Sequence, residues 1–139
     1  MKKLSLIFFL LNSIISLAQD KKVIENKIDI LEKDCLNKEN ISNADMCNCM
    51  IKARESWDVE LNKNYNLLKN KLPEKCFLVL KEAQKTWIEY RDKEFLFVTN
   101  YFYEVKEGTM WYPVSENTKK EMVKQRALEL KKYLEMLDY

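Results

Sequence analysis

Four polar residues are spaced so that their side chains could act together in one site: Asp58, Asn62, Gln84 and Arg91. Arg91 interrupts an apolar stripe within the helix-compatible stretch of residues 83–95, in which every fourth position is otherwise alanine, tryptophan or phenylalanine. A guanidinium beside a carboxylate and two amides can hold a polar ligand, or it can be paired inside the protein. The paired role is favoured, because a buried guanidinium without a partner is strongly destabilising.

Two helices would position this set, predicted over residues 46–72 and 74–105 and joined at Pro73. In an antiparallel hairpin around that turn, the amides of Asn62 and Gln84 lie at the same height along the two helices. Arg91 lies within reach of Asp58. Neither helix face carries two carboxylates suited to acid–base chemistry, so the set predicts no catalysis. We therefore predict a structural ladder of two polar pairs, with a ligand-binding cleft as the alternative. The pairs are Asn62 with Gln84, and Asp58 with Arg91.

Two further helices complete the predicted fold. A short amphipathic helix spans residues 24–35, and a last helix, capped by Ser115, follows a loop over residues 106–117. The whole chain contains one glycine and two prolines, too few for the turns of a sheet. We therefore predict an all-α fold, a small antiparallel bundle of about four helices with the hairpin of residues 46–105 at its centre.

The first eighteen residues have the pattern of a secretory signal peptide. Lys2 and Lys3 precede an apolar run, and small residues come before an expected cleavage after Ala18. We predict that residues 1–18 are removed and that residues 19–139 form a single all-helical domain, secreted or periplasmic, without membrane insertion. Loss of the two lysines leaves 22 basic against 22 acidic residues, a balance that does not predict binding to nucleic acid.

The chain has no histidine, so the commonest general base and metal ligand is missing. It also has no glycine-rich loop and no serine or cysteine beside a base. We expect a protein that is not an enzyme and that uses no metal and no cofactor. In an exported chain, four cysteines are expected to form disulfides and not a zinc site.

The positions of the cysteines restrict their pairing. Cys35 ends the first helix and Cys47 and Cys49 begin the second, so these three lie at one end of the bundle. Cys76 begins the third helix about 30 Å away, far beyond the separation of about 7 Å that a disulfide allows. Cys47 and Cys49 point about 200° apart on a helix, so only one of them can face Cys35. Cys76 and the thiol left over are expected to be free or intermolecular.

Two segments of the chain are similar to a known family. WDVELNKNYNLLKNKL (57–72) and LKEAQKTWIEYRDKEF (80–95) resemble the LprI-type lysozyme inhibitor N-terminal domain family, over about residues 35–98. The hallmark positions of that family fall on eight residues of this chain: Asp58, Leu61, Asn62, Tyr65, Gln84, Trp87, Arg91 and Asp92.

The resemblance implies a small exported helical domain that binds another molecule. It favours a disulfide between Cys35 and Cys49, with Cys35–Cys47 as the second choice. Phe95 is a departure, since the family often has a cysteine shortly after the arginine–aspartate pair.

Aromatic residues are concentrated after the matched segment, on both sides of the predicted loop. They are Tyr101, Phe102, Tyr103, Trp111 and Tyr112, together with Met110. Burial under the last helix is the favoured interpretation of the cluster as a whole. Trp111 and Tyr112, placed on the loop, are the best candidates for contact with a partner, and Tyr101 and Tyr103 are the next.

The sequence thus predicts an exported helical binding module, with inhibition of a lysozyme as the activity that the resemblance suggests. A protein partner is expected, and the aromatic rings could also stack on a cell-wall glycan. The alternative is an envelope or cell-wall protein with a structural or interaction role and no inhibitory activity.

Overall fold

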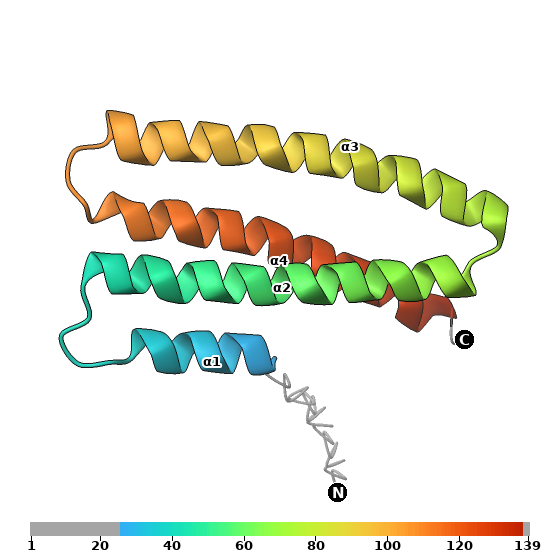
Figure 1. Ribbon diagram of the computed structural model, residues 1–139, viewed down its shortest axis with the longest axis horizontal. Coiled ribbons are helices and arrows are strands. Elements are labelled where there is room, and N and C mark those ends of the chain that lie inside the picture. Colours follow the sequence, from blue (N-terminus) through green and yellow to red (C-terminus); the bar gives the residue numbers. More distant parts are fainter. Residues whose placement is uncertain (1–25, 138–139) are drawn as a thin grey trace, which may run out of the picture.

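The computed structural model describes residues 26–137, which form four α-helices and one short π-helix (Figure 1). The elements are α1 (Lys27–Leu36), α2 (Asn43–Lys71), α3 (Glu74–Thr99), η1 (Asn100–Val105, the π-helix) and α4 (Trp111–Leu137). No strand occurs between residues 26 and 137, and the predicted all-α bundle is confirmed. The predicted signal peptide, residues 1–18, lies outside the described residues.

The centre of the bundle is the pair α2 and α4. Consecutive helices run antiparallel, so these two are parallel neighbours, and they make the most extensive helix–helix contact of the fold (Figure 1). α1 packs along α2, and α3 lies at the outer edge of the row, beyond α4 (Figure 1). The predicted central hairpin is therefore wrong in one respect. α2 and α3 are joined at Pro73 as expected, but α4 is the main partner of α2.

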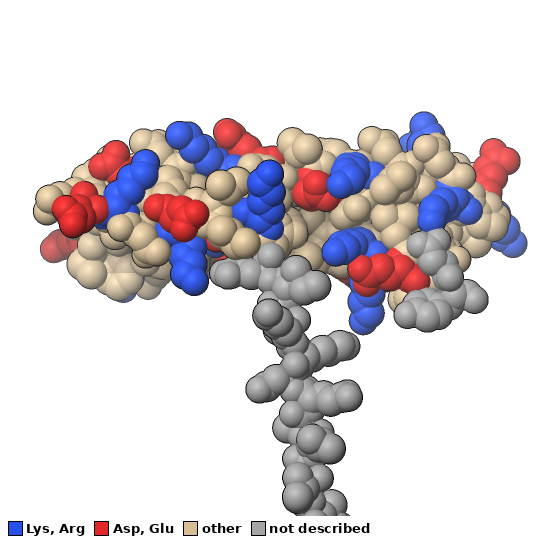
Figure 2. Space-filling view, turned by 90° about the horizontal axis from the view of Figure 1, so that it is seen from below, with Lys and Arg blue, Asp and Glu red and all other residues tan. Residues whose placement is uncertain are grey.

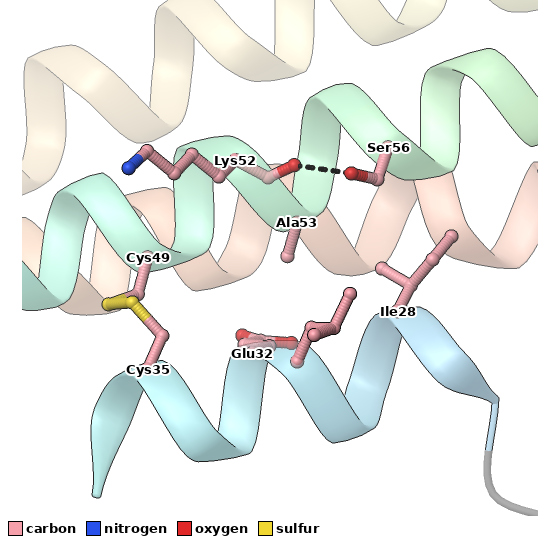
Figure 3. Close-up of a pocket in the computed structure, with 8 residues that line it drawn as sticks. Ile28, Glu32, Cys35, Cys49, Lys52, Ala53 and Ser56 are labelled. Atoms are coloured by element: carbon pink, nitrogen blue, oxygen red, sulfur yellow. Dashed lines mark hydrogen bonds between the residues drawn. A yellow bond between two sulfur atoms is a disulfide. The ribbon is translucent and has the colours of Figure 1, made fainter. Parts of the chain in front are cut away.

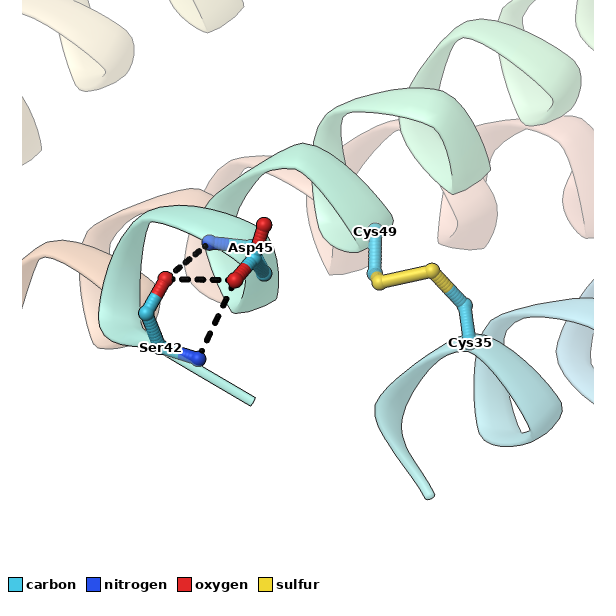
Figure 4. Close-up of a disulfide and its surroundings, with 4 residues drawn as sticks. All are labelled: Cys35, Ser42, Asp45 and Cys49. Atoms are coloured by element: carbon cyan, nitrogen blue, oxygen red, sulfur yellow. Dashed lines mark hydrogen bonds between the residues drawn. A yellow bond between two sulfur atoms is a disulfide. The ribbon is translucent and has the colours of Figure 1, made fainter. Parts of the chain in front are cut away.

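Side chains cap the first two helices. Asn26 Oδ1 accepts a hydrogen bond from the Ile28 N–H at 2.9 Å at the start of α1. At the start of α2, Ser42 Oγ accepts from the Asp45 N–H at 3.1 Å, and the Asp45 carboxylate accepts from the Ser42 N–H at 3.2 Å (Figure 4). This reciprocal capping box satisfies two N–H groups that have no partner within the helix. The hydrogen bonds to Ser42 also lower the pKa of Asp45.

The last helix begins earlier than predicted. The loop expected over residues 106–117 is confined to residues 106–110, where Gly108 has a positive φ of 92°. Ser115, expected as the N-cap, lies inside α4 and is fully buried, and its Oγ has no hydrogen-bond partner. Pro113 stands in the first turn, where the N–H groups have no helical acceptor, so proline is compatible with a helix that starts at Trp111.

The apolar core lies between α2 and α4. Its buried side chains are Trp57, Leu61 and Leu68 from α2 and Val123, Ala127, Leu130 and Leu134 from α4. Burial of a side chain of this size contributes about 1.5–3 kcal/mol, so this seam is the largest stabilising feature of the bundle. Asn64 is also buried there and donates from Nδ2 to the Ala127 carbonyl at 3.1 Å, which fixes the register of the two helices.

Two lysines of α4 bind carboxylates of α1. Lys120 Nζ lies 2.7 Å from Glu32 Oε1, and both side chains are buried. Lys124 Nζ lies 2.8 Å from Asp29 Oδ1, and the same ammonium sits over the Trp57 ring. These ion pairs connect the short first helix to α4 across the face of α2.

α3 contacts the other helices through large side chains, because its backbone lies close to theirs at few points. The Tyr65 and Phe77 rings are 5.5 Å apart, and Trp87 and Phe95 pack partly buried against the core. Its outward side is exposed along its whole length. Among residues 26–137, no helix is long and apolar enough to cross a membrane.

Candidate functional site

The C-terminal part of α3, η1, the loop of residues 106–110 and the first turn of α4 meet in a surface that we call the aromatic end. Its side chains are Phe97, Tyr101, Phe102, Lys106, Met110 and Trp111. Phe97 and Met110 are each 63% exposed, and Tyr101 is 38% exposed. An exposed apolar surface of this kind is unusual and is typical of interaction sites.

The rings of the aromatic end form one continuous array. The Tyr101 ring stacks on Phe97 with centroids 6.2 Å apart and meets the edge of Phe102 at 5.1 Å. Phe102 in turn stacks on Trp111 at 6.0 Å. Lys106 Nζ lies 5.4 Å from the Tyr101 centroid and 4.9 Å from the Trp111 centroid, so its cation is held between two rings.

A π-helix carries three consecutive aromatic residues of this surface. The Lys106 N–H donates to the Tyr101 carbonyl at 3.0 Å, an acceptor five residues earlier in the chain instead of the four of an α-helix. Tyr101, Phe102 and Tyr103 stack on three separate partners, Phe97, Trp111 and Tyr112. π-helical turns are rare and occur frequently at functional sites, which supports this surface as the candidate site.

An inner polar network lies behind the exposed rings. Tyr103 stacks on Tyr112 with centroids 4.2 Å apart, and its Oη donates to Glu116 Oε1 at 3.2 Å. Glu116 is buried and also accepts hydrogen bonds from Arg54 and Lys119, each at 2.9 Å. The carboxylate is therefore fully paired, and the network anchors η1 to α2 and α4.

Burial raises the pKa of Tyr103 far above its ordinary value of 10.0, and the negative charge of Glu116 raises it further. Burial likewise raises the pKa of the free Cys47 thiol, and Glu116 adds to this shift. Both groups stay neutral at ordinary pH. A protonated thiol is a poor nucleophile, so Cys47 is a packing residue here.

The predicted contact residues divide into two layers. Tyr101 and Trp111 belong to the ring array, in which Tyr101 is exposed and Trp111 is half-buried, whereas Tyr103 and Tyr112 form a separate stacked pair and are both half-buried. Trp111 and Tyr112 were expected on a loop, but they lie in the first turn of α4. Contact between these rings and a partner stays a prediction.

The predicted polar ladder between α2 and α3 is not formed. Asn62 Nδ2 donates to Asp58 Oδ2 within α2 at 3.0 Å, and Arg91 Nη2 bonds Asp92 Oδ1 at 2.7 Å. Asn62 and Gln84 do line one groove between the helices, together with Tyr65, Lys81, Lys85, Ile88 and Glu89. The ladder fails because α3 lies beyond α4, so polar side chains of α3 reach α4 first (Figure 1).

The position of Arg91 in the apolar stripe of α3 is explained by its contacts with aromatic rings. Its guanidinium lies 5.4 Å from the Trp87 centroid and 5.8 Å from the Phe95 centroid, one turn to either side. Arg126 of α4 lies over the same Trp87 ring at 5.9 Å, and Arg54 of α2 lies over Phe95 at 5.5 Å. The arginine in the apolar stripe therefore belongs to a row of stacked guanidinium and aromatic groups that joins α3 to its neighbours.

Residues 35–130 match the family described as lysozyme inhibitor LprI. This stretch is more than half of the chain and includes α2, α3, the aromatic end and most of α4. The chain belongs to the LprI lysozyme inhibitor family. The resemblance predicted over residues 35–98 is confirmed, and it extends through the aromatic end.

The fold is also similar to a solved structure. A crystal structure of an uncharacterised protein from Burkholderia thailandensis superposes with a TM-score of 0.76 and 28% sequence identity. The alignment covers 83% of this chain and 56% of the Burkholderia chain, so this LprI family member spans little more than half the length of that relative. No curated protein matches the chain.

The disulfide implied by the family resemblance is present. Cys35 of α1 is bonded to Cys49 of α2 with Cα atoms 5.8 Å apart (Figure 4). Cys47 and Cys76 are free thiols, the first half-buried and the second exposed. The disulfide ties the short helix α1 to the end of α2, next to the capping box of Ser42 (Figure 4).

A small cavity of about 210 Å³ lies between α1 and α2 next to this disulfide (Figure 3). Its walls include Ile28 and Ala53 together with the disulfide (Figure 3). The Glu32 carboxylate at its edge is bound to Lys120, and Ser56 Oγ donates to the Lys52 carbonyl at 2.9 Å. Apart from the Lys52 ammonium, the polar groups of the cavity are already paired, so it offers a ligand little to recognise.

Sequence reasoning missed two parts of this LprI family member. Glu116, Lys119 and Arg54 were not recognised as a network, because partners 62 residues apart along the chain leave no local pattern. Lys106 was not recognised as part of the aromatic end, because its neighbours are set by the π-helix. Among residues 26–137, no cluster of histidine, cysteine or acidic residues is arranged to hold a metal.

Proposed function

We propose that this LprI family member is an exported inhibitor that binds a lysozyme through the aromatic end. The observation that supports the proposal is the combination of the family match with a partly exposed ring array inside the matched residues. Large rigid aromatic side chains dominate the energetics of protein interfaces. Tyr101, Met110 and Trp111 would make the central contact.

The chemistry of the aromatic end suits a glycan-cleaving cleft. Lysozyme cleaves its substrate between two carboxyl groups, through a transition state with positive charge on the sugar ring. Flat rings can occupy the place of sugar rings, and Lys106, held between Tyr101 and Trp111, would supply a cation beside the carboxylates. The aromatic end of the proposed inhibitor therefore resembles the substrate in two ways, through its flat rings and through the positive charge of Lys106.

The charge distribution does not oppose binding to a basic lysozyme. Three cations of α4, Lys119, Lys120 and Arg126, are buried in ion pairs and present no basic face. On the face shown in Figure 2, basic and acidic side chains are interspersed. A surface of mixed sign neither attracts nor repels a basic target strongly, so affinity would depend on the aromatic contact.

A lysis assay with a c-type lysozyme tests the proposal, using protein exported from the full-length sequence. We expect inhibition at micromolar concentration. Met110→Ser should weaken the inhibition about tenfold, as expected for a residue at the centre of an interface. Met136→Ser is the matched control, because Met136 has the same exposed fraction, 63%, at the opposite end of α4.

Two outcomes would count against the proposal. Absence of inhibition at micromolar protein would reject the lysozyme target. Equal effects of the two methionine substitutions would reject the aromatic end as the site. Binding of the protein to insoluble cell-wall glycan without any effect on lysozyme would instead favour an envelope-associated role.

A further inference from the structure

The outward side of α3 is a continuous exposed face that nothing in the bundle covers. Its residues follow a spacing of four and three along the helix: Lys75, Val79, Glu82, Thr86, Glu89, Lys93, Leu96 and Asn100. All eight are exposed, and we call them the outer face. α3 forms one edge of the row of helices in Figure 1, so a partner could approach this face along its whole length.

The outer face is complementary to itself. When two copies of α3 are placed antiparallel, with the two-fold axis between residues 87 and 88, each outer-face residue meets a different one. The facing pairs are Lys75 with Asn100, Val79 with Leu96, Glu82 with Lys93, and Thr86 with Glu89. Apolar residues therefore meet near both ends of the contact, just inside the pair of Lys75 and Asn100, and opposite charges meet between them.

The geometry points to a second copy of this chain as the partner, in a two-fold antiparallel dimer built on α3. Three large apolar side chains outside the aromatic end, each more than half exposed, would be covered: Leu78, Val79 and Leu96. Within residues 26–137, the Glu82 carboxylate and the Lys93 ammonium have no ion-pair or hydrogen-bond partner, so both are available for the contact. A two-fold axis makes that pair form twice.

The dimer is expected to be weak. A helix of 26 residues is about 39 Å long, and a contact between two single helices buries less surface than a stable dimer usually needs. The antiparallel arrangement would place the aromatic ends of the two copies at opposite ends of the dimer. This inference does not depend on the nature of the target at the aromatic end.

Sedimentation of the protein exported from the full-length sequence, at concentrations up to about 0.5 mM, tests the dimer, because interfaces this small dissociate in the micromolar range or above. Glu82→Lys alone, or Lys93→Glu alone, creates two like-charge contacts and should weaken the dimer at least about tenfold. The double variant Glu82→Lys/Lys93→Glu restores opposite charges and should restore dimerisation. Glu55→Lys, an exposed residue on α2, is the control for net charge.

Circular dichroism of each variant would establish that its helices are intact. A chain that stays monomeric up to the highest concentration would overturn the inference. A dimer that responds to Glu82→Lys and Glu55→Lys alike would also overturn it, because the contact would then lie elsewhere. Failure of the double variant to restore dimerisation would reject the antiparallel register.

Discussion

Arg126 of α4 donates a hydrogen bond from Nε to Oε1 of Gln84 on α3 across 2.9 Å, and both side chains are buried. The same guanidinium lies over Trp87 and bonds Glu129. Arg126 thus fixes the position of a helix that makes few close backbone contacts with the rest of the bundle.

The Gln84–Arg126 contact predicts a measurable coupling between the two helices. Arg126→Met should lower the free energy of unfolding by about 2 kcal/mol, because it leaves the buried Gln84 amide without its partner. Gln84→Leu combined with Arg126→Met should be less destabilising than the sum of the single changes, by about 1 kcal/mol. Urea denaturation of the four proteins measures this cycle, and additive effects would contradict the contact.

The pH dependence of the free energy of unfolding should show that folding raises the pKa of Tyr103. Its pKa is raised in the folded chain, so above about pH 10 the unfolded chain loses a proton that the folded chain keeps. Stability should therefore fall as pH rises through that value. Tyr103→Phe should reduce the slope of this fall, while it costs some stability at neutral pH through the lost hydrogen bond to Glu116. Unfolding free energies of both proteins between pH 8 and pH 11 provide the comparison, and equal slopes would contradict the raised pKa of Tyr103.

The disulfide between Cys35 and Cys49 should stabilise the attachment of α1. Cys35→Ser should lower the free energy of unfolding by about 3 kcal/mol, as expected for a bond that closes a loop of this length. Cys76→Ser is the matched control, because Cys76 is a free and exposed thiol. Denaturation under non-reducing conditions gives both values. An equal loss in the two variants would show that the disulfide does not form in solution.

Local elements of the fold could be predicted from the sequence, and the pairing of the helices could not. The apolar period of the last helix runs through Val123, Ala127, Leu130, Leu134 and Leu137. The first four are core residues, whereas Leu137 is exposed. The apolar period of a helix does not identify the neighbouring helix that its apolar stripe contacts. α3 was therefore assigned to α2, whereas the seam of α2 is filled by α4.

Polar residues were harder to place than apolar ones. The burial of Lys120 could not be predicted, because no local sequence pattern indicates the buried Glu32 that this lysine binds on another helix. Ser115 looked like a helix cap because a proline precedes it at position 113, yet that proline lies inside the first turn. The π-helix of residues 100–105 left no recognisable signal beyond an unusual run of aromatic residues.

We propose that the aromatic end enters the substrate cleft of a lysozyme, and competition for that cleft tests this most directly. Calorimetric titration of a c-type lysozyme with this protein would be carried out with and without an oligosaccharide inhibitor that occupies the cleft. We expect the apparent affinity to fall in proportion to the occupancy of the cleft by the oligosaccharide. An affinity that is unchanged by the oligosaccharide, or a complete absence of binding, would contradict it.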